Sequence, residues 1–257
     1  MVKRFVLAAV MTFVGVSTLS AQTRYTSHTQ MRTVDSGDQM SAMIGAAMAQ
    51  VYPPEGVDQT VYLGDLGMRV EVKQAMAGMP AGTVLITKAD GARFGMDPAA
   101  KTFWKIAPVS TEALTALGVQ PTFKVSKTGQ FETIAGMKAE KVVITVSIPL
   151  PGVDPANPPP GVPATLGLTM TIWMTDALKA PKGQSSVDLG ALSGMAGGAL
   201  KELAGDGRLT VKSLIQGFGM ELATTTKDYN PATLTPAMFA VPEGFKEIPQ
   251  PQPKIGG

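Results

Sequence analysis

The residue types that most often carry catalysis are scarce in this sequence. Its 257 residues include a single His, His28, and no Cys. Thiol catalysis and disulfides are therefore excluded, and a zinc site built from the usual His and Cys ligands cannot be assembled. A Ser–His–acid triad would have to use His28, which falls on the polar face of a predicted strand. Because the chain also lacks a nucleophile-elbow motif, a structural role for His28 is favoured over a catalytic one.

Carboxylates are numerous, but their spacing matches no known site. Asp35, Asp38, Asp58 and Asp65 lack the regular intervals of a calcium-binding loop. Two acids converging from distant strands, as in a glycosidase, are neither indicated nor excluded by the sequence. The Gly-rich stretch 194–198 is not followed by the Lys-Ser/Thr pair of a phosphate-binding loop. We therefore expect no cofactor, no metal and no enzymatic activity, with an enzyme of unrecognised type as an alternative.

The first 21 residues have the pattern of a secretory signal. Lys3 and Arg4 precede an apolar run, 5–16, that is too short to span a bilayer comfortably, and small residues follow up to Ala21. We expect cleavage after Ala21 or within a residue or two of it; an uncleaved anchor is the alternative. Without Cys, the chain has no lipobox residue to carry a lipid anchor. The mature protein is expected in the periplasm or outside the cell, with no stable membrane span after signal removal.

The charge balance excludes one class of partner. The chain has 22 Lys and Arg against 20 Asp and Glu, so removing Lys3 and Arg4 leaves 20 of each. A nucleic-acid-binding protein needs a basic surplus on one face, and no cluster of Lys and Arg here is longer than two. We therefore expect no nucleic-acid partner. Neither charge nor composition specifies an oligomeric state.

Alternation of polar and apolar residues predicts a protein built mainly from strands. The period of two over residues 24–34 indicates a half-exposed strand, and turn signals such as Asp90-Gly91 indicate antiparallel hairpins. The other predicted strands are 58–63, 68–74, 83–88, 92–97, 101–106, 122–127, 131–148, 168–174, 209–226 and a short edge segment at 238–245. Turns are expected at Thr128-Gly129 and, within 131–148, at Ala135-Gly136. Hairpin-length connections imply antiparallel pairing across most of the sheet.

A helix is predicted over residues 36–52, between a cap at Ser36 or Asp38 and Pro53-Pro54. Its apolar stripe contains Met40, Met43, Ile44, Ala47, Met48 and Val51. Since Met side chains repack around different shapes, the helix is either ordinary core or a lid over an apolar ligand. Further helical patterns occur at 110–117 and 185–205.

The lid interpretation defines a candidate ligand site. The helix contributes Met40, Met43, Ile44 and Met48 to this site. From the inner side of the sheet it takes Trp104, Met170, Ile172 and Phe218. These inward assignments follow from alternation alone, and a slip of one residue would reverse them.

The elements imply a single α+β domain over residues 22–248. We expect a curved antiparallel sheet accompanied by two or three helices, and a disordered tail at 249–257. Seven prolines among residues 149–163 exclude a central strand or a helix there. This stretch is either an exposed insertion between strands or a docking site for a partner.

Four short motifs carry a resemblance to a known family. They are the turn MDPAAKT at 96–102, the hairpin ETIAGMKAEK at 132–141, the strand IWM at 172–174 and the closing FAVPEGF at 239–245. In this order, over most of residues 24–248, they resemble a secreted bacterial domain-of-unknown-function family. That family is related to the outer-membrane lipoprotein carrier (LolA/LolB-like) superfamily. The resemblance implies an open half-barrel whose apolar concave face is covered by helices, and a lipid or lipoprotein acyl chain as the bound partner.

Two functional classes follow besides the enzyme alternative. The first is a non-enzymatic periplasmic protein that binds an apolar ligand, a lipid or an acyl chain, in the concave face of the sheet. The second is a structural or interaction protein of the envelope that uses the Pro-rich loop or a sheet edge and has no small-molecule ligand. A carrier should have a continuous apolar cavity beneath the Met-rich helix, whereas in an interaction protein side chains should fill that space.

Overall fold

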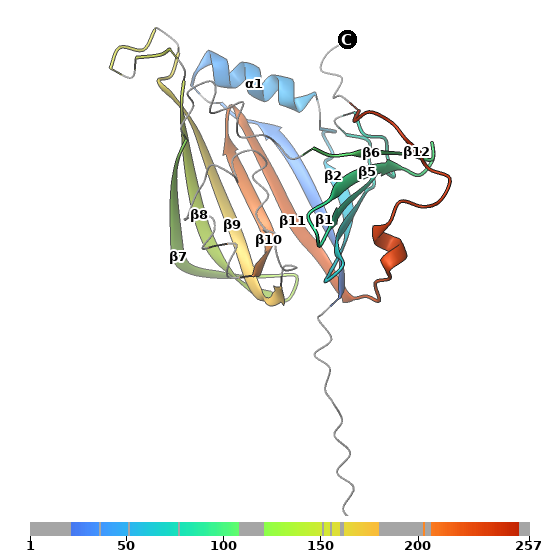
Figure 1. The fold of residues 1–257 in the computed structure, drawn as a ribbon. Helices are drawn as coiled ribbons and strands as arrows, with labels where there is room; N and C mark the ends of the chain where they lie inside the picture. Colours follow the sequence, from blue (N-terminus) through green and yellow to red (C-terminus); the bar gives the residue numbers. More distant parts are fainter. Residues whose placement is uncertain are drawn as a thin grey trace, which may run out of the picture.

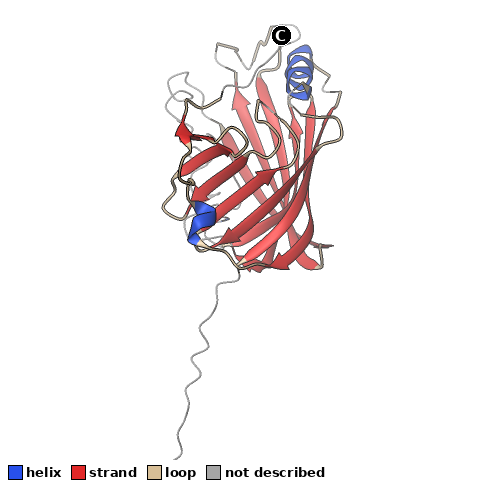
Figure 2. Ribbon diagram, turned by 90° about the vertical axis from the view of Figure 1, so that its right-hand side faces the viewer, coloured by secondary structure: helices blue, strands red, loops and turns tan. Residues whose placement is uncertain are grey.

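The computed structural model describes residues 22–107, 121–179 and 207–251 together with Leu203, apart from residues 36, 51, 77, 151, 155, 160 and 161. These residues form one open, curved sheet of 12 strands, in the order β12-β6-β5-β4-β3-β2-β1-β11-β10-β9-β8-β7 (Figures 1 and 2). The strands are β1 (Thr23–Thr33), β2 (Val57–Gly64), β3 (Gly67–Val72), β4 (Val84–Lys88), β5 (Arg93–Asp97), β6 (Thr102–Lys105), β7 (Thr122–Ile134), β8 (Met137–Pro149), β9 (Thr165–Lys179), β10 (Arg208–Gly217), β11 (Met220–Pro231) and β12 (Lys246–Glu247). All neighbouring pairs are antiparallel except β12 and β6. The predicted curved antiparallel sheet is therefore confirmed.

Strand β1 joins the two halves of the sheet, between β2 and β11. Its side chains alternate as the sequence predicts: Tyr25, Ser27 and Met31 are buried, whereas Arg24 and Arg32 are exposed. Alternating side chains point to opposite faces of a strand, so one face of β1 is covered and the other meets solvent.

The hairpin of β7 and β8 differs from its prediction. The expected turn at Thr128-Gly129 is wrong, because β7 continues through it and the chain reverses only at Ala135-Gly136. Lys127 pairs with Val142 and Phe131 with Glu140, so two extra residues of β7 form a bulge. Gly129 accommodates this with a φ of +68°, a conformation that costs glycine little.

The predicted strand over 209–226 is two strands. A tight turn at Phe218-Gly219, both with positive φ, separates β10 from β11. Alternation continues across this turn in the sequence, which explains why the two strands read as one. Gly219 supplies the left-handed conformation that the turn requires.

The helix content is lower than the α+β prediction. Among the described residues there is one α-helix, α1 (Gln39–Ala49), beside the 3-10 helix η1 (Pro236–Phe239) and a helical residue at Leu203. Asp38 caps α1, since its Oδ1 accepts a hydrogen bond from the Ser41 amide at 2.7 Å. Helix α1 lies across one end of the sheet and not over its concave face (Figures 1 and 2). The protein is thus mostly β, and a cover of two or three helices is not what the described residues show.

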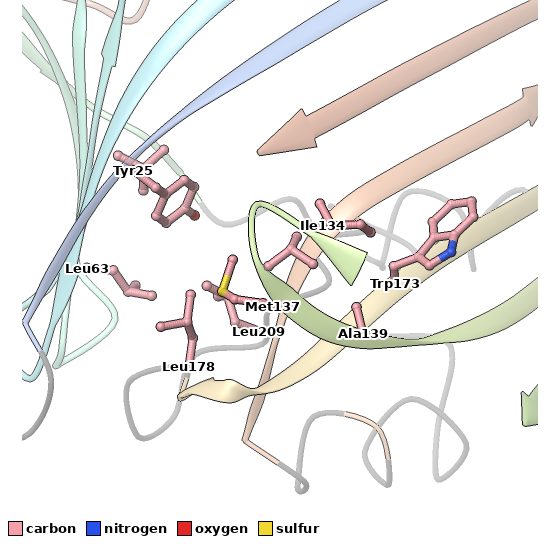
Figure 3. Close-up of a cluster of buried hydrophobic side chains, with 10 residues drawn as sticks. Tyr25, Leu63, Ile134, Met137, Ala139, Trp173, Leu178 and Leu209 are labelled. Atoms are coloured by element: carbon pink, nitrogen blue, oxygen red, sulfur yellow. The ribbon is translucent and has the colours of Figure 1, made fainter. Parts of the chain in front are cut away.

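Three apolar clusters stabilise the sheet. The β8–β9 cluster contains Val142, Ile144, Val146, Leu168, Met170, Ile172, Met174 and Leu203. The hairpin-tip cluster places Ile134 and Met137 of the β7–β8 turn against Tyr25, Leu63, Trp173 and Leu209 (Figure 3). The C-terminal cluster joins Val84, Ile86, Phe94 and Met96 of β4 and β5 to Leu234 and Phe239.

The C-terminal segment also differs from its prediction. The expected edge segment at 238–245 is wrong: η1 packs Phe239 into the C-terminal cluster, and the edge strand is β12, two residues long. Arg69 of β3 donates a hydrogen bond to the Met238 carbonyl at 2.9 Å, which holds η1 in place.

Several predictions fall outside the described residues. These are the signal segment 1–21, the helix at 110–117, the helix at 185–205 apart from Leu203, and the tail from 252. Where the structure is described, no helix is both long enough and apolar enough to cross a membrane.

Candidate functional site

The β8–β9 cluster forms an apolar surface over three adjacent strands. Ile144 of β8 lies opposite Met170 of β9, which in turn lies opposite Ile215 of β10. Val142 and Ile172 form the next row, and both are almost fully buried. Leu203, the described residue of the second predicted helical stripe, packs on this surface with 1% of its area exposed. The predicted site residues Met170 and Ile172 therefore lie together in a covered apolar face.

A groove of about 350 Å³ opens at the α1 end of this face. Phe218 and Leu166 supply its apolar walls, and Ser41 of α1 and Gly167 of β9 also line it. Phe218 and Ile148 pack against the β8–β9 cluster, so the groove continues from the covered apolar surface. The structure thus brings Phe218 together with Met170 and Ile172.

Helix α1 borders this groove in an orientation that differs from the predicted one. Ser41 and Gly45 are buried, Ile44 is half-buried, and Ala47 and Met43 are exposed, Met43 by 67%. The side chains of Met40 and Met48 lie outside the described part of the structure. The helix rests on the β10–β11 turn, where a Cβ on Gly45 would collide with the carbonyl of Gly219. Small residues therefore face the sheet, because the two backbones approach closely there.

A second groove, of about 330 Å³, lies at the other end of α1. Met31 of β1, Ala49 of α1 and Tyr52 line it. Burial raises the pKa of Tyr52, so its hydroxyl stays uncharged. Among the described residues, α1 therefore borders a groove at each of its ends.

Trp104 lies apart from the other predicted site residues. Cross-strand pairs lead from Met170 through Ile215 and Leu222 to Met31 of β1. Tyr25 lies on the same face of β1 as Met31 and pairs with Val61, from which further pairs lead through Val70, Leu85 and Gly95 to Trp104, so Trp104 shares a face with Met170. Seven strands nevertheless separate β6 from β9 in the sheet. The Trp104 ring lies over Gly95, where no Cβ would fit, and only 3% of the residue is exposed.

The opposite end of the β8–β9 face is polar. Arg208 Nη1 of β10 lies 2.5 Å from Glu140 Oε2 of β8, and only 9% and 19% of these side chains are exposed. Lys127 and Asp176 complete the lining of an open surface depression of about 370 Å³ there. A buried ion pair of this kind holds two strands in register at a desolvation cost.

His28 lies in a charged network on the outer part of β1. Its Nδ1 is 2.9 Å from Asp58 Oδ1, and Lys227 Nζ is 3.2 Å from the same oxygen. The hydrogen bond from His28 and then that from Lys227 hold the pKa of Asp58 below its ordinary value. No group of three or more His, Asp or Glu side chains in the described parts of the chain could hold a metal ion.

The sequence prediction missed several residues of the site. Val142, Ile144 and Val146 belong to the apolar run of 131–148, whose two faces look alike, so alternation could not select the covered one. Gly217 and Gly219 carried a usable signal, since glycines in a strand often mark a close approach. Both do so here: Gly217 abuts Gly167, and Gly219 abuts Ser41.

Comparison with known proteins gives only distant relatives. No family model and no curated protein matches the chain. Among solved structures, it is similar to a LolA superfamily protein from Nitrosomonas europaea, with 8% identity, a TM-score of 0.34, and coverage of 86% of this chain and 90% of that one. The lipoprotein LppX of Mycobacterium tuberculosis matches with 13% identity, a TM-score of 0.28, and coverage of 85% and 91%. LprF from Mycobacterium bovis matches with 14% identity, a TM-score of 0.29, and coverage of 82% and 89%.

These TM-scores are too low to transfer a ligand or a residue role to this chain, and any functional argument must rest on its own residues. One of these similar structures is a LolA superfamily protein, the group that the sequence motifs resemble.

Proposed function

We propose that this chain is a non-enzymatic, exported envelope protein that binds a lipid or a single acyl chain. The ligand lies in the groove beside Phe218, against the end of the β8–β9 cluster. The signal directs export and is removed near Ala21, so the groove is exposed to the periplasm or the medium.

The observation that carries the proposal is the continuity between groove and cluster. A groove of about 350 Å³ is large enough for part of an acyl chain, since ligand pockets start at roughly 300 Å³. Phe218 belongs to both features: it lines the groove and packs against the cluster that contains Met170 and Ile172. An apolar chain in the groove would therefore contact Phe218, Leu166 and Val34. Asp35 and Asp38 line the same groove and could face a polar head group.

The proposed contacts differ in accessibility. Met170 and Ile172 are 3% and 1% exposed and do not line the groove; they belong to the cluster against which Phe218 packs. Phe218 and Leu166 are half-buried and lie at the surface of the groove. Ile44 of α1 is half-buried nearby, whereas Met43 is turned to solvent and serves as a control.

The test is Phe218→Gly, measured with an apolar fluorescent probe. Phe218 has a φ of +53°, which glycine adopts without strain, so the variant loses the ring while its turn is kept. We expect probe affinity to fall about tenfold, the order expected for losing one buried aromatic contact. Met43→Gln, at a largely exposed position of α1, should bind the probe as the unmodified protein does.

Two results would contradict the proposal. One is unchanged probe affinity in a folded Phe218→Gly variant. The other is failure of the unmodified protein to bind the probe, together with no co-purified lipid in native mass spectrometry. Either would favour the envelope structural or interaction protein that uses the Pro-rich loop or a sheet edge.

A further inference from the structure

The groove beside Phe218 carries charge of one sign. Among the described residues that line it, Asp35 and Asp38 are acidic and none is a Lys, Arg or His. Residues 22–257 as a whole have 20 charges of each sign, so this negative excess is local. The groove at the other end of α1 differs, because its described lining contains Arg32 and no carboxylate. Charge therefore distinguishes the two grooves, although they are similar in volume.

Two backbone contacts place these carboxylates beside the apolar wall of the groove. The Val34 amide donates a hydrogen bond to the Gly219 carbonyl at 2.9 Å, so Asp35 directly follows a residue held against the β10–β11 turn. A Cβ on Gly219 would collide with the Ser41 carbonyl, so the first turn of α1, which Asp38 caps, touches the same turn. The aromatic residue of the groove immediately precedes Gly219. The ring and both carboxylates therefore belong to one site.

The local structural roles of the two carboxylates do not account for their charge. Asp35 Oδ1 accepts a hydrogen bond from the Gly37 amide at 3.0 Å, and Asp38 Oδ1 accepts one from the Ser41 amide at 2.7 Å. An asparagine makes such turns and caps about as well as an aspartate. The positive end of a helix is equivalent to about half a charge, so two carboxylates exceed it by about one and a half charges. The groove as a whole therefore attracts cations.

An organic cation fits this groove better than a metal ion. Calcium takes roughly six to eight oxygen ligands, whereas no group of three His, Asp or Glu in the described residues could hold a metal. A protonated amine needs only a few hydrogen-bond acceptors on one side. Gln216 donates from Nε2 to Glu221 at 2.9 Å, so its amide oxygen is a further acceptor that it can present to the groove. Val34, Leu166 and Phe218 supply the apolar part of the lining.

We propose that the ligand of this groove is an amphiphile with a positively charged amino head group and a single acyl or alkyl chain. The ammonium donates hydrogen bonds to the Asp35 and Asp38 carboxylates, while the chain lies against Leu166 and Phe218. This inference rests on the proposed ligand-binding function and adds the charge of the head group to it. A fatty acid or an anionic phospholipid would instead bring like charge against the carboxylates.

Competition between amphiphiles of equal chain length tests the head-group preference. The apolar fluorescent probe, bound to the chain from Gln22 onward at about neutral pH, is displaced with decylammonium, decanol or decanoate below their micellar concentrations. We expect decylammonium to bind about tenfold more tightly than decanoate, with decanol between them. Because the carboxylates are partly exposed, the preference should shrink in about 0.5 M NaCl.

Matched variants separate these two carboxylates from the total charge of the protein. Asp35→Asn combined with Asp38→Asn should lower the affinity for decylammonium to that for decanol. Asp35→Asn alone, which leaves the cap of α1 untouched, should lower it about fivefold. The control is Asp90→Asn combined with Asp97→Asn. Those carboxylates, at either end of β5, also accept backbone amide hydrogen bonds, at 2.9 Å each, and five strands lie between β5 and β10 in the sheet. The control loses the same two charges and should keep the preference.

Three results would overturn the head-group assignment. They are equal affinity for decylammonium and decanoate, tighter binding of decanoate, and a preference that persists in the variant with both Asp35→Asn and Asp38→Asn. Binding of the probe and of decanol without a preference for the ammonium contradicts this inference alone and leaves the ligand-binding function standing. Failure of the unmodified protein to bind the probe, decanol and decylammonium contradicts both.

Discussion

At the scale of single residues, Asp58 links three strands through one carboxylate. It lies in β2 and contacts His28 of β1, Lys227 of β11 and the Gln74 side chain, whose Nε2 is 3.4 Å from Asp58 Oδ2. The only histidine is thus a cross-strand partner of a carboxylate. His28→Ala should therefore leave ligand binding unchanged.

The lowered pKa of Asp58 predicts a pH-dependent contribution to stability. Because its folded pKa lies below the ordinary value of 3.8, the contribution is present above pH 3.8 and is lost as the pH falls through the folded pKa. Asp58→Asn should therefore be less stable than the unmodified protein at pH 7, and the difference should shrink below pH 3.8.

Urea unfolding at several pH values measures this difference. The effect is expected to be small, because about half of the Asp58 side chain is exposed to solvent. Glu55→Gln, which changes an exposed carboxylate in the loop before β2, is the control. A deficit of the same size at pH 7 and at pH 3 would show that the ionised carboxylate is not what matters.

At the scale of elements, the packing of α1 against the β10–β11 turn depends on two glycines. Gly45 faces Gly219 of the β10–β11 turn, and a Cβ on Gly219 would collide with the Ser41 carbonyl. The two backbones touch with no side chain between them. This contact decides which face of the helix is buried.

Gly45→Ala should therefore destabilise the protein although alanine is the better helix former. Alanine would gain about 1 kcal/mol in an unhindered helix, but the collision with the rigid Gly219 backbone should cost about 1–3 kcal/mol and shift α1. Thermal unfolding and limited proteolysis of α1 measure the outcome. Ala46→Ser, at an exposed position of the same helix, should change both only slightly. A Gly45→Ala variant more stable than the unmodified protein would refute the close contact.

At the scale of the whole molecule, the β7 side and the β6 side of the sheet are covered by different segments. The β8–β9 cluster is covered by Leu203, whereas the C-terminal cluster is covered by η1 and the residues around it. A two-residue strand, β12, then closes the β6 edge, where Ile248 donates a hydrogen bond to the Phe103 carbonyl at 2.8 Å. The last residues of the chain thus pack against its first hairpins.

Phe239→Ala tests how much this return contributes. Phe239 is 4% exposed, and removing a buried Phe ring costs about 3–5 kcal/mol. We expect the free energy of unfolding, measured with denaturant, to fall by that amount. Lys246→Ala, at an exposed position of β12, should have little effect. A loss below about 1 kcal/mol for Phe239→Ala would show that the C-terminal segment is only loosely attached.

The sequence by itself determined most strands and their antiparallel pairing. Side-chain alternation reports which residues point to one side of an extended chain, and short turns such as Asp90-Gly91 permit only a hairpin. Both signals are local, so they can be read from the sequence without knowledge of the rest of the fold. For the same reason Met170 and Ile172 could be assigned to one face of β9 from the sequence.

Only the tertiary structure decided how the elements meet. The Met stripe of α1 suggested that Met43 faces the sheet, yet the close approach of Gly45 to Gly219 turns Met43 outward. The pairing of β12 with β6 joins residues more than 140 positions apart, and no local period records such a contact. Helix orientation and long-range pairing depend on surfaces supplied by distant segments, and those surfaces exist only once the chain has folded.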